Sequence, residues 1–255
     1  MDIISLDIGG KFAHFRKYYA NNTALSYTIP PRTTMIGMLA AILGRERDSY
    51  YEELASDKIM LGVRILSPLK KTFHRLNLLS IKTSDDFTGK GGRIQTPFEV
   101  VTGHALPTDW VVYRIFVGCT EEGKAVFEEL KISLQNRTQK FNLTLGTANF
   151  TASILKVQVF ENQNSKTNSD WIPVHTAVPS NMVLGLDFEK DVNGAMNFLE
   201  EELLPADFLD NQNREVKKMV RAVYSTQNLP FMVKLSVPFY SLLSEDETQN
   251  IVFLE

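Results

Sequence analysis

The stretch Ile29-Pro30-Pro31-Arg32-Thr33-Thr34-Met35-Ile36-Gly37-Met38-Leu39-Ala40-Ala41-Ile42-Leu43-Gly44 carries the clearest structural pattern in the chain. Its proline pair cannot lie inside a helix, and the hydroxyl of Thr33 or Thr34 could cap a helix that follows. The large apolar residues then recur at the i, i+3, i+4, i+7, i+8 spacing of one helical face: Met35, Met38, Leu39, Ile42 and Leu43. Gly44 is a suitable residue to end the helix. The pattern therefore predicts an amphipathic helix, whose small residues would let it pack closely on a sheet.

Apolar runs on both sides of this helix predict β-strands. They lie at residues 3–8, 59–65, 73–81, 98–101, 111–117 and 154–160, and a second helix is expected at Gly123–Leu130. The polar, glycine-rich segment Asp85–Arg93 is typical of the tip of a long hairpin, which we place near residues 82–101. The resulting order is close to the split βαβ arrangement of ferredoxin-like domains. We therefore predict an α+β fold, with a ferredoxin-like domain over residues 1–160.

The last third of the chain predicts a separate unit. The segment Glu161–Asp170 is almost wholly polar and suits a linker or an exposed loop. Beyond it, strand-like runs occur near residues 182–186, 219–224, 232–237 and 251–254, and an amphipathic helix is expected at Val192–Leu204. The sequence thus predicts a smaller, mainly β domain over residues 171–255.

The composition is that of a globular protein, with 44% hydrophobic and 22% charged residues. Met35–Leu43, the longest apolar candidate, is too short to cross a bilayer, and Met1-Asp2 does not open a signal-peptide pattern. Cys119 is the only cysteine, which excludes disulfide bonds within the chain. We therefore expect a cytoplasmic protein with no membrane contact.

Charge is distributed unevenly along a chain whose net charge is −3. Residues 1–120 contain 15 Lys/Arg against 11 Asp/Glu, whereas residues 121–255 contain 12 against 19. Acidic residues are missing between Asp7 and Glu46, and again between Asp57 and Asp85. These two basic windows predict a local phosphate-binding track.

The basic windows also supply the candidate RNA-binding residues, because cations can hold an RNA backbone while aromatic rings stack on its bases. The expected contacts in the first window are Lys11, His14, Arg16, Lys17, Tyr27 and Arg32. Thr33 and Thr34 join them, since free N–H groups at a helix start can receive a phosphate. The second window and the hairpin add Lys71, Arg75, Lys82, Lys90 and Arg93. The competing interpretation is that some of the aromatic residues, Tyr27 among them, belong to the core.

Other kinds of site find less support in the sequence. Gly118–Ala125 is close to a phosphate-binding P-loop, but Ala125 has no hydroxyl to bind Mg²⁺. The four histidines lie far apart without cysteine partners, so we expect no metal and no cofactor. A metal-independent ribonuclease that uses His14 or His74 stays an alternative, as does a protein-interaction module that binds no RNA.

Three motifs resemble those of CRISPR-associated protein 5, a family of the RAMP superfamily, in its type I-B-like form. The first motif runs from Phe12 to Gly44, the second is the glycine-containing loop Leu145–Ala152, and the third is the chain end Asn250–Leu254. The resemblance implies a ferredoxin-like (RRM/RAMP) domain whose thumb is the hairpin near residues 82–101. It also adds Asn149, in the glycine-containing loop, to the expected RNA contacts.

The same resemblance implies a role in antiviral defence. The chain would be a non-catalytic, RNA-binding subunit of a type I CRISPR interference (Cascade) complex that holds the 5′ repeat-derived handle of the crRNA. The other implied partners are the backbone subunit, the large subunit and target DNA near the PAM. Members of the type I-C branch also cut precursor RNA with a tyrosine and an adjacent Lys-His pair. This sequence has no Lys-His dipeptide, so the resemblance implies binding without catalysis.

Overall fold

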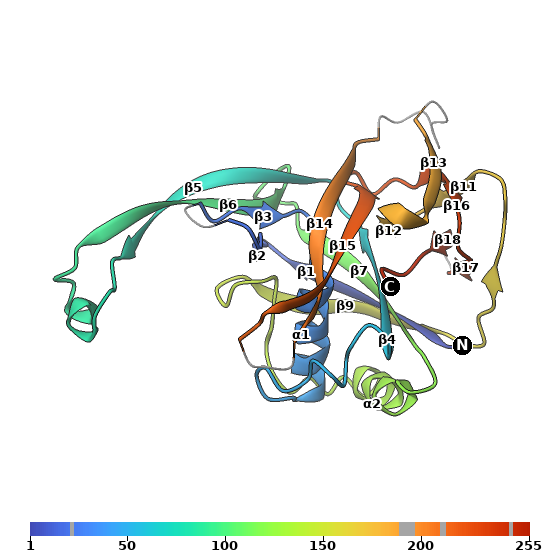
Figure 1. The fold of residues 1–255 in the computed structure, drawn as a ribbon, viewed down its shortest axis with the longest axis horizontal. Coiled ribbons are helices and arrows are strands. Elements are labelled where there is room, and N and C mark those ends of the chain that lie inside the picture. Colours follow the sequence, from blue (N-terminus) through green and yellow to red (C-terminus); the bar gives the residue numbers. More distant parts are fainter. Residues whose placement is uncertain (21–22, 189–196, 210–212, 245–246) are drawn as a thin grey trace.

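The structure is a computed structural model that describes residues 1–20, 23–188, 197–209, 213–244 and 247–255. The described chain is mostly β, with two α-helices, α1 (Arg32–Leu43) and α2 (Lys124–Gln135) (Figure 1). No helix in these ranges is long and apolar enough to span a bilayer.

A five-stranded antiparallel sheet forms the centre of the molecule. Its strands lie in the order β4 (Ile59–Ile65), β7 (Val111–Cys119), β1 (Ile3–Gly10), β9 (Thr151–Phe160) and β8 (Leu143–Thr144). The predicted strands at 3–8, 59–65, 111–117 and 154–160 are therefore confirmed. In the sequence, α1 lies between β1 and β4, and α2 lies between β7 and β9. Both helices share one apolar core with the sheet.

Helix α1 ends as predicted but begins differently. Gly44 follows it with a φ of 76°, in the left-handed region that favours glycine. Its N-cap residue is Pro31, and no side chain caps the helix, so the predicted capping by Thr33 or Thr34 is wrong. Both threonines lie inside the first turn, and the Thr33 hydroxyl is 3.5 Å from the Pro205 carbonyl oxygen that accepts its hydrogen bond.

The predicted hairpin exists and is longer than expected. Strands β5 (Leu69–Leu79) and β6 (Arg93–Gly103) pair along their whole length, with the short 3₁₀ helix η1 (Ser84–Thr88) at the tip. The hairpin projects far from the rest of the molecule (Figure 1), and we call it the thumb. Several large apolar side chains on it are exposed: Phe73, Leu76, Leu78, Leu79, Ile81, Phe87 and Ile94. An isolated two-stranded ribbon is marginally stable in water, so this surface suits contact with a partner.

The rest of the chain consists of short sheets. One contains β10 (Ser165–Lys166), β17 (Phe239–Leu243) and β18 (Thr248–Ile251), and another contains β11 (Ile172–Val174), β16 (Phe231–Leu235) and β13 (Val183–Asp187). A third contains β12 (Val178–Pro179), β15 (Val216–Ser225) and β14 (Leu199–Phe208). Two short pieces complete the fold: the hairpin of β2 (Phe15–Arg16) with β3 (Ser26–Tyr27), and the 3₁₀ helix η2 (Ser180–Met182).

The predicted helix at Val192–Leu204 is wrong where the structure describes it. Residues 199–204 belong to β14, which pairs with β15 from Leu199↔Ser225 to Phe208↔Val216. This long-range pairing satisfies the backbone and overrides the local helical pattern. Residues 192–196 of the predicted helix lie outside the described residues.

The β14–β15 hairpin packs onto the main core rather than onto a separate one. Leu204 and Ala206 from β14, and Ala222 and Tyr224 from β15, lie in the same apolar cluster as α1 and the central sheet. Leu254 belongs to that cluster as well, and its N–H donates to the Leu61 carbonyl at 2.9 Å. The division into domains at 1–160 and 171–255 stays a prediction.

Arg32 joins the two parts of the chain by charge as well as by packing. Its side chain is fully buried, and Nε donates to Glu255 at 2.6 Å while one terminal nitrogen donates to Asp207 at 2.7 Å. The other terminal nitrogen donates to the carbonyls of Leu54 (2.9 Å) and Ile59 (2.6 Å). Burying a charge is costly unless it is paired and hydrogen-bonded, and this guanidinium is both.

We expect Arg32→Met to destabilise the protein by roughly 3–5 kcal/mol, because it leaves Asp207 and Glu255 without their cation in a largely buried place. Urea unfolding measures this loss. The control is Arg47→Met, since the Arg47 side chain is 79% exposed and its ion pair is worth at most about 1 kcal/mol. Equal stability of the two variants would contradict a structural role for Arg32.

Candidate nucleic-acid interface

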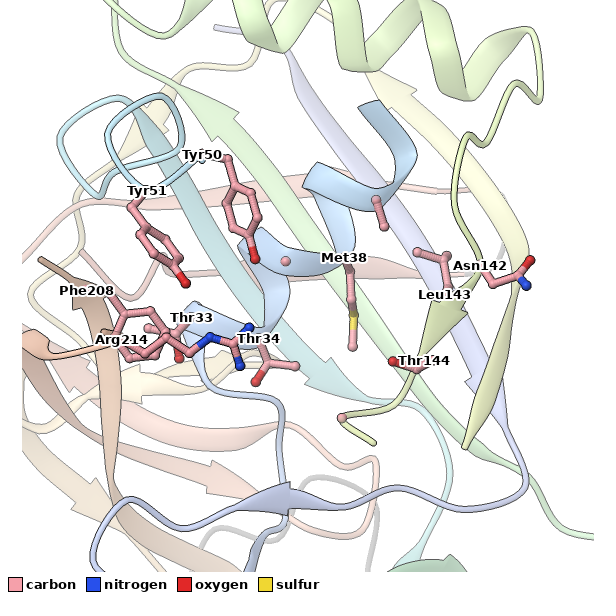
Figure 2. A pocket seen from close by; sticks show the side chains of 13 residues that line it. Thr33, Thr34, Met38, Tyr50, Tyr51, Asn142, Leu143, Thr144, Phe208 and Arg214 are labelled. Atoms are coloured by element: carbon pink, nitrogen blue, oxygen red, sulfur yellow. The ribbon is translucent and has the colours of Figure 1, made fainter. Parts of the chain in front are cut away.

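A groove lies beside the N-terminal end of α1. It has two parts, with volumes of about 300 and 480 Å³. The two parts are adjacent, since five residues line both of them: Thr33, Thr34, Gly146, Phe208 and Arg214. We call the whole the α1 groove, and Figure 2 shows its first part.

The lining of the α1 groove favours an anionic, partly aromatic ligand. The first part adds the hydroxyl-bearing residues Tyr50, Tyr51 and Thr144, and the second part adds Arg16 and Tyr18. Of the described residues that line either part, none is Asp or Glu. Arg16 and Arg214 therefore bring guanidinium groups to a lining without carboxylates, although Arg214 also forms an ion pair with Asp48 outside the lining at 2.9 Å.

The start of α1 contributes side chains more than free N–H groups. The N–H groups of Thr34 and Met35 both donate to the Pro31 carbonyl, at 2.9 and 3.0 Å. The expectation of N–H groups free to receive a phosphate is therefore wrong for Thr34 and Met35. Thr33 and Thr34 do lie at the groove wall, near Arg214 (Figure 2).

The glycine-containing loop closes another side of the groove against His14. The His14 N–H donates to the Leu145 carbonyl at 3.0 Å. Gly146 follows with a φ of 97°, and a Cβ atom there would lie 1.8 Å from the His14 carbonyl oxygen. Only glycine fits this close approach, so Gly146 fixes the loop against the chain segment that carries His14 and Arg16.

Arg214 is a candidate contact that the sequence did not indicate. Its Nε donates to Asp48 at 2.9 Å, and the Tyr51 hydroxyl donates to the same carboxylate. Burial opposes ionisation, but the hydrogen bonds from Tyr51 and Arg214 hold the pKa of Asp48 below its usual value. Asp48 therefore stays charged and holds Arg214 at the groove. These residues are far apart in the sequence, and only the fold brings them together.

Four expected RNA contacts are buried, and two of them, His14 and Thr33, still line the α1 groove, whereas Arg32 and Tyr27 do not. Arg32 is fully buried in the ion-pair network described above. The Tyr27 side chain is also buried, with 0% exposure, so its ring belongs to the core. Arg32 is held by carboxylates that follow it by more than 170 residues, and Tyr27 lies in the main apolar cluster, so both expectations are wrong.

Three lysines are engaged by other groups of the chain. Lys11 donates to the carbonyls of Leu106, Pro107 and Asp109, and thereby fastens the loop before β7. Lys17 forms an ion pair with Glu202 at 2.6 Å, and the Lys71 ammonium lies 3.6 Å from the same carboxylate. Glu202 thus neutralises part of the predicted phosphate track.

The thumb keeps its expected cations at the surface. Arg75, Lys82, Lys90 and Arg93 are exposed, and none forms an ion pair with another described residue. Asn149 is exposed as well, in the loop that carries Gly146. Their contacts with RNA stay predictions.

Several solved structures resemble this chain at low sequence identity. A crystal structure of a CRISPR protein from Archaeoglobus fulgidus has a TM-score of 0.56 and 12% identity, with 100% of both chains covered. A chain of a CRISPR RNA-guided surveillance complex has a TM-score of 0.47 and 15% identity, with 91% of each chain covered. A chain of a Type III-B Cmr-beta complex bound to cognate target RNA and AMPPnP has a TM-score of 0.44 and 12% identity, with 91% of this chain and 86% of that chain covered.

The sequence itself identifies the family. No curated protein matches it. Residues 3–224, which make up most of the chain, match the family described as CRISPR-associated protein (Cas_Cas5). The family expected from the three sequence motifs is thereby confirmed, and the chain belongs to the CRISPR-associated protein (Cas_Cas5) family.

Proposed function

We propose that this protein is an RNA-binding subunit of a CRISPR effector complex and that it holds the 5′ handle of the crRNA in the α1 groove. The observation that carries the proposal is the lining of the groove, where Arg16 and Arg214 face a surface without carboxylates among the described residues. Arginine can bind phosphate through two parallel hydrogen bonds, and the exposed ring of Tyr18 can stack on an unpaired base. Membership of the family supports the CRISPR role.

We propose further that the core is a ferredoxin-like RAMP domain whose thumb contacts both RNA and a neighbouring subunit. The order of strands β4-β7-β1-β9, with one helix after β1 and one after β7, supports this assignment. The thumb presents exposed cations for RNA next to exposed apolar side chains such as Phe73 and Ile94. Those apolar residues suit contact with the backbone or large subunit of the complex, in which the chain would act in the cytoplasm, close to target DNA.

Binding without cleavage is part of the proposal. His14 is buried and its Nδ1 atom is held by a carbonyl, whereas His74 is exposed on the thumb with its Nε2 atom 3.3 Å from the Thr72 hydroxyl. Among the described residues that line the groove, His14 has no carboxylate or lysine beside it to act as a second proton-transfer group.

Removing the two arginine charges should weaken RNA binding. We expect Arg16→Gln/Arg214→Gln to reduce the affinity for a repeat-derived handle RNA about 100-fold or more, because each of the two lost charged hydrogen bonds contributes about 1.5–3 kcal/mol. The salt slope of log K should also become less steep by about 1.4, or 0.7 for each lost phosphate contact on a single strand. Fluorescence anisotropy over a range of salt concentrations measures both quantities.

The matched control for this experiment is Lys124→Gln/Lys166→Gln, which removes the same charge from two exposed lysines that do not line the groove. Equal affinities and slopes for the two double variants would show that the α1 groove does not hold the RNA. A wild-type chain that binds neither handle RNA nor a scrambled RNA would favour the protein-interaction alternative.

The RNA should stay intact when it is bound. We expect labelled repeat RNA, incubated with the protein in EDTA, to shift on a native gel and to remain uncut on a denaturing gel. Lys90→Glu/Arg93→Glu should weaken the shift, since it reverses two exposed thumb charges. A discrete cut within the repeat that survives EDTA would contradict the binding-only proposal and make the protein a metal-independent endoribonuclease.

A further inference from the structure

His14 presents a fixed hydrogen-bond acceptor to the α1 groove. Its Nδ1 atom lies 2.7 Å from the Glu99 carbonyl oxygen. A carbonyl oxygen only accepts, so Nδ1 must carry the hydrogen, and in the neutral ring Nε2 is then an acceptor. The tautomer of His14 thus follows from one backbone contact.

The orientation of the ring is fixed as well. His14 stacks on Phe98 with the ring centroids 4.0 Å apart and 26° between the planes. Its N–H is tied to Leu145, and Gly146 lies against its carbonyl. A ring held by packing on one face and by hydrogen bonds at its backbone and at Nδ1 has little freedom to turn.

The Nε2 atom reaches the groove. In the described part of the chain, only Thr102 Oγ1 and Gln249 Nε2 are buried side-chain atoms without a hydrogen-bond partner. His14 Nε2 also has no partner within the described residues, yet it is not among these buried atoms. Because His14 lines the second part of the groove, its Nε2 atom lies at the groove surface.

Burial favours the neutral form of the ring. Burial lowers the pKa of His14; the contact with the Glu99 carbonyl opposes this shift, and the positive charge of Arg16 adds to it. His14 Nε2 is therefore a hydrogen-bond acceptor beside Arg16, the cation that would hold a neighbouring phosphate.

We infer that His14 Nε2 accepts a hydrogen bond from one nucleotide of the RNA bound in the α1 groove and so contributes to recognition of that nucleotide. The inference rests on the proposed function. The donor is either the 2′-hydroxyl of a ribose, which distinguishes RNA from DNA, or an N–H group of an unstacked base, which distinguishes one base from another. His14 is then a specificity-determining residue rather than a general base.

A pair of variants separates the two nitrogen atoms of the ring. His14→Asn keeps an amide N–H near the position of Nδ1 and loses the acceptor. His14→Gln places an amide oxygen near the position of Nε2 and loses the donor to Glu99. We expect His14→Asn to bind the handle RNA about 3- to 10-fold more weakly than the wild type, as the loss of one neutral hydrogen bond predicts, and His14→Gln to keep most of the affinity.

The RNA supplies the other half of the test. Handle RNAs that carry a single 2′-deoxy nucleotide at each position, and RNAs with a single base lacking its N–H donor, are measured against the wild type and both variants. We expect one modified RNA to bind the wild-type protein about 3- to 10-fold more weakly than the unmodified RNA does. The same modified RNA should bind His14→Asn as tightly as the unmodified RNA does, because that variant has already lost the acceptor. A 2′-deoxy position identifies the ribose as the donor, and a base change identifies the base.

Three results would overturn the inference. One is equal binding of every RNA by His14→Asn and the wild type. Another is that His14→Asn binds every modified RNA more weakly than the wild type does, by one common factor, which indicates a structural role for His14. If His14→Asn does not fold, the wild-type protein alone decides: the inference is overturned when no single RNA modification lowers its affinity by more than twofold. A wild-type chain that binds no handle RNA would instead remove the proposed function itself.

Discussion

The guanidinium of Arg32 is buried where α1 begins, and the rest of the molecule is arranged around it. Two carboxylates from the C-terminal part of the chain, Asp207 and Glu255, surround it together with the carbonyls of Leu54 and of Ile59, the first residue of β4. A buried arginine needs all of these partners, because desolvating a charge without them is expensive. The position of α1, and with it the wall of the α1 groove formed by Thr33 and Thr34, therefore depends on residues at the far end of the sequence.

This pairing also explains the uneven distribution of charge along the sequence. Residues 121–255 contain 19 Asp/Glu against 12 Lys/Arg. Several of these carboxylates face inward, where Glu202 lies against Lys17 and Lys71 and Asp207 lies against Arg32. Part of the apparent basic track is thus neutralised inside the molecule. The cations that remain available line the groove or project along the thumb, as Arg16 and Lys90 do.

Local patterns in the sequence predicted local structure well. The alternating run Ile59–Ile65 forms β4 with the predicted bounds, and the glycine-rich tip indicated the thumb. The errors arise where a distant segment decides the outcome. The local pattern of residues 199–204 predicts a helix, but these residues pair with β15 as a strand. Arg32 and Lys17 are predicted RNA contacts, but carboxylates of β14 form ion pairs with both. The groove could be predicted only in part. Arg16 lies in a basic window of the sequence, whereas Arg214 is held at the groove by its ion pair with Asp48, a contact that depends on the tertiary structure.

The separation in sequence between Arg32 and its partners has a consequence during synthesis on the ribosome. Asp207 and Glu255 follow Arg32 by 175 and 223 residues. A nascent chain that has completed the central sheet therefore still carries an arginine without its carboxylates at the start of α1. Contacts of such long range form late and slow the folding of a domain. The N-terminal part of this protein should reach its final packing only after Asp207 and Glu255 have left the ribosome, so the first half of the chain alone is not yet packed for assembly.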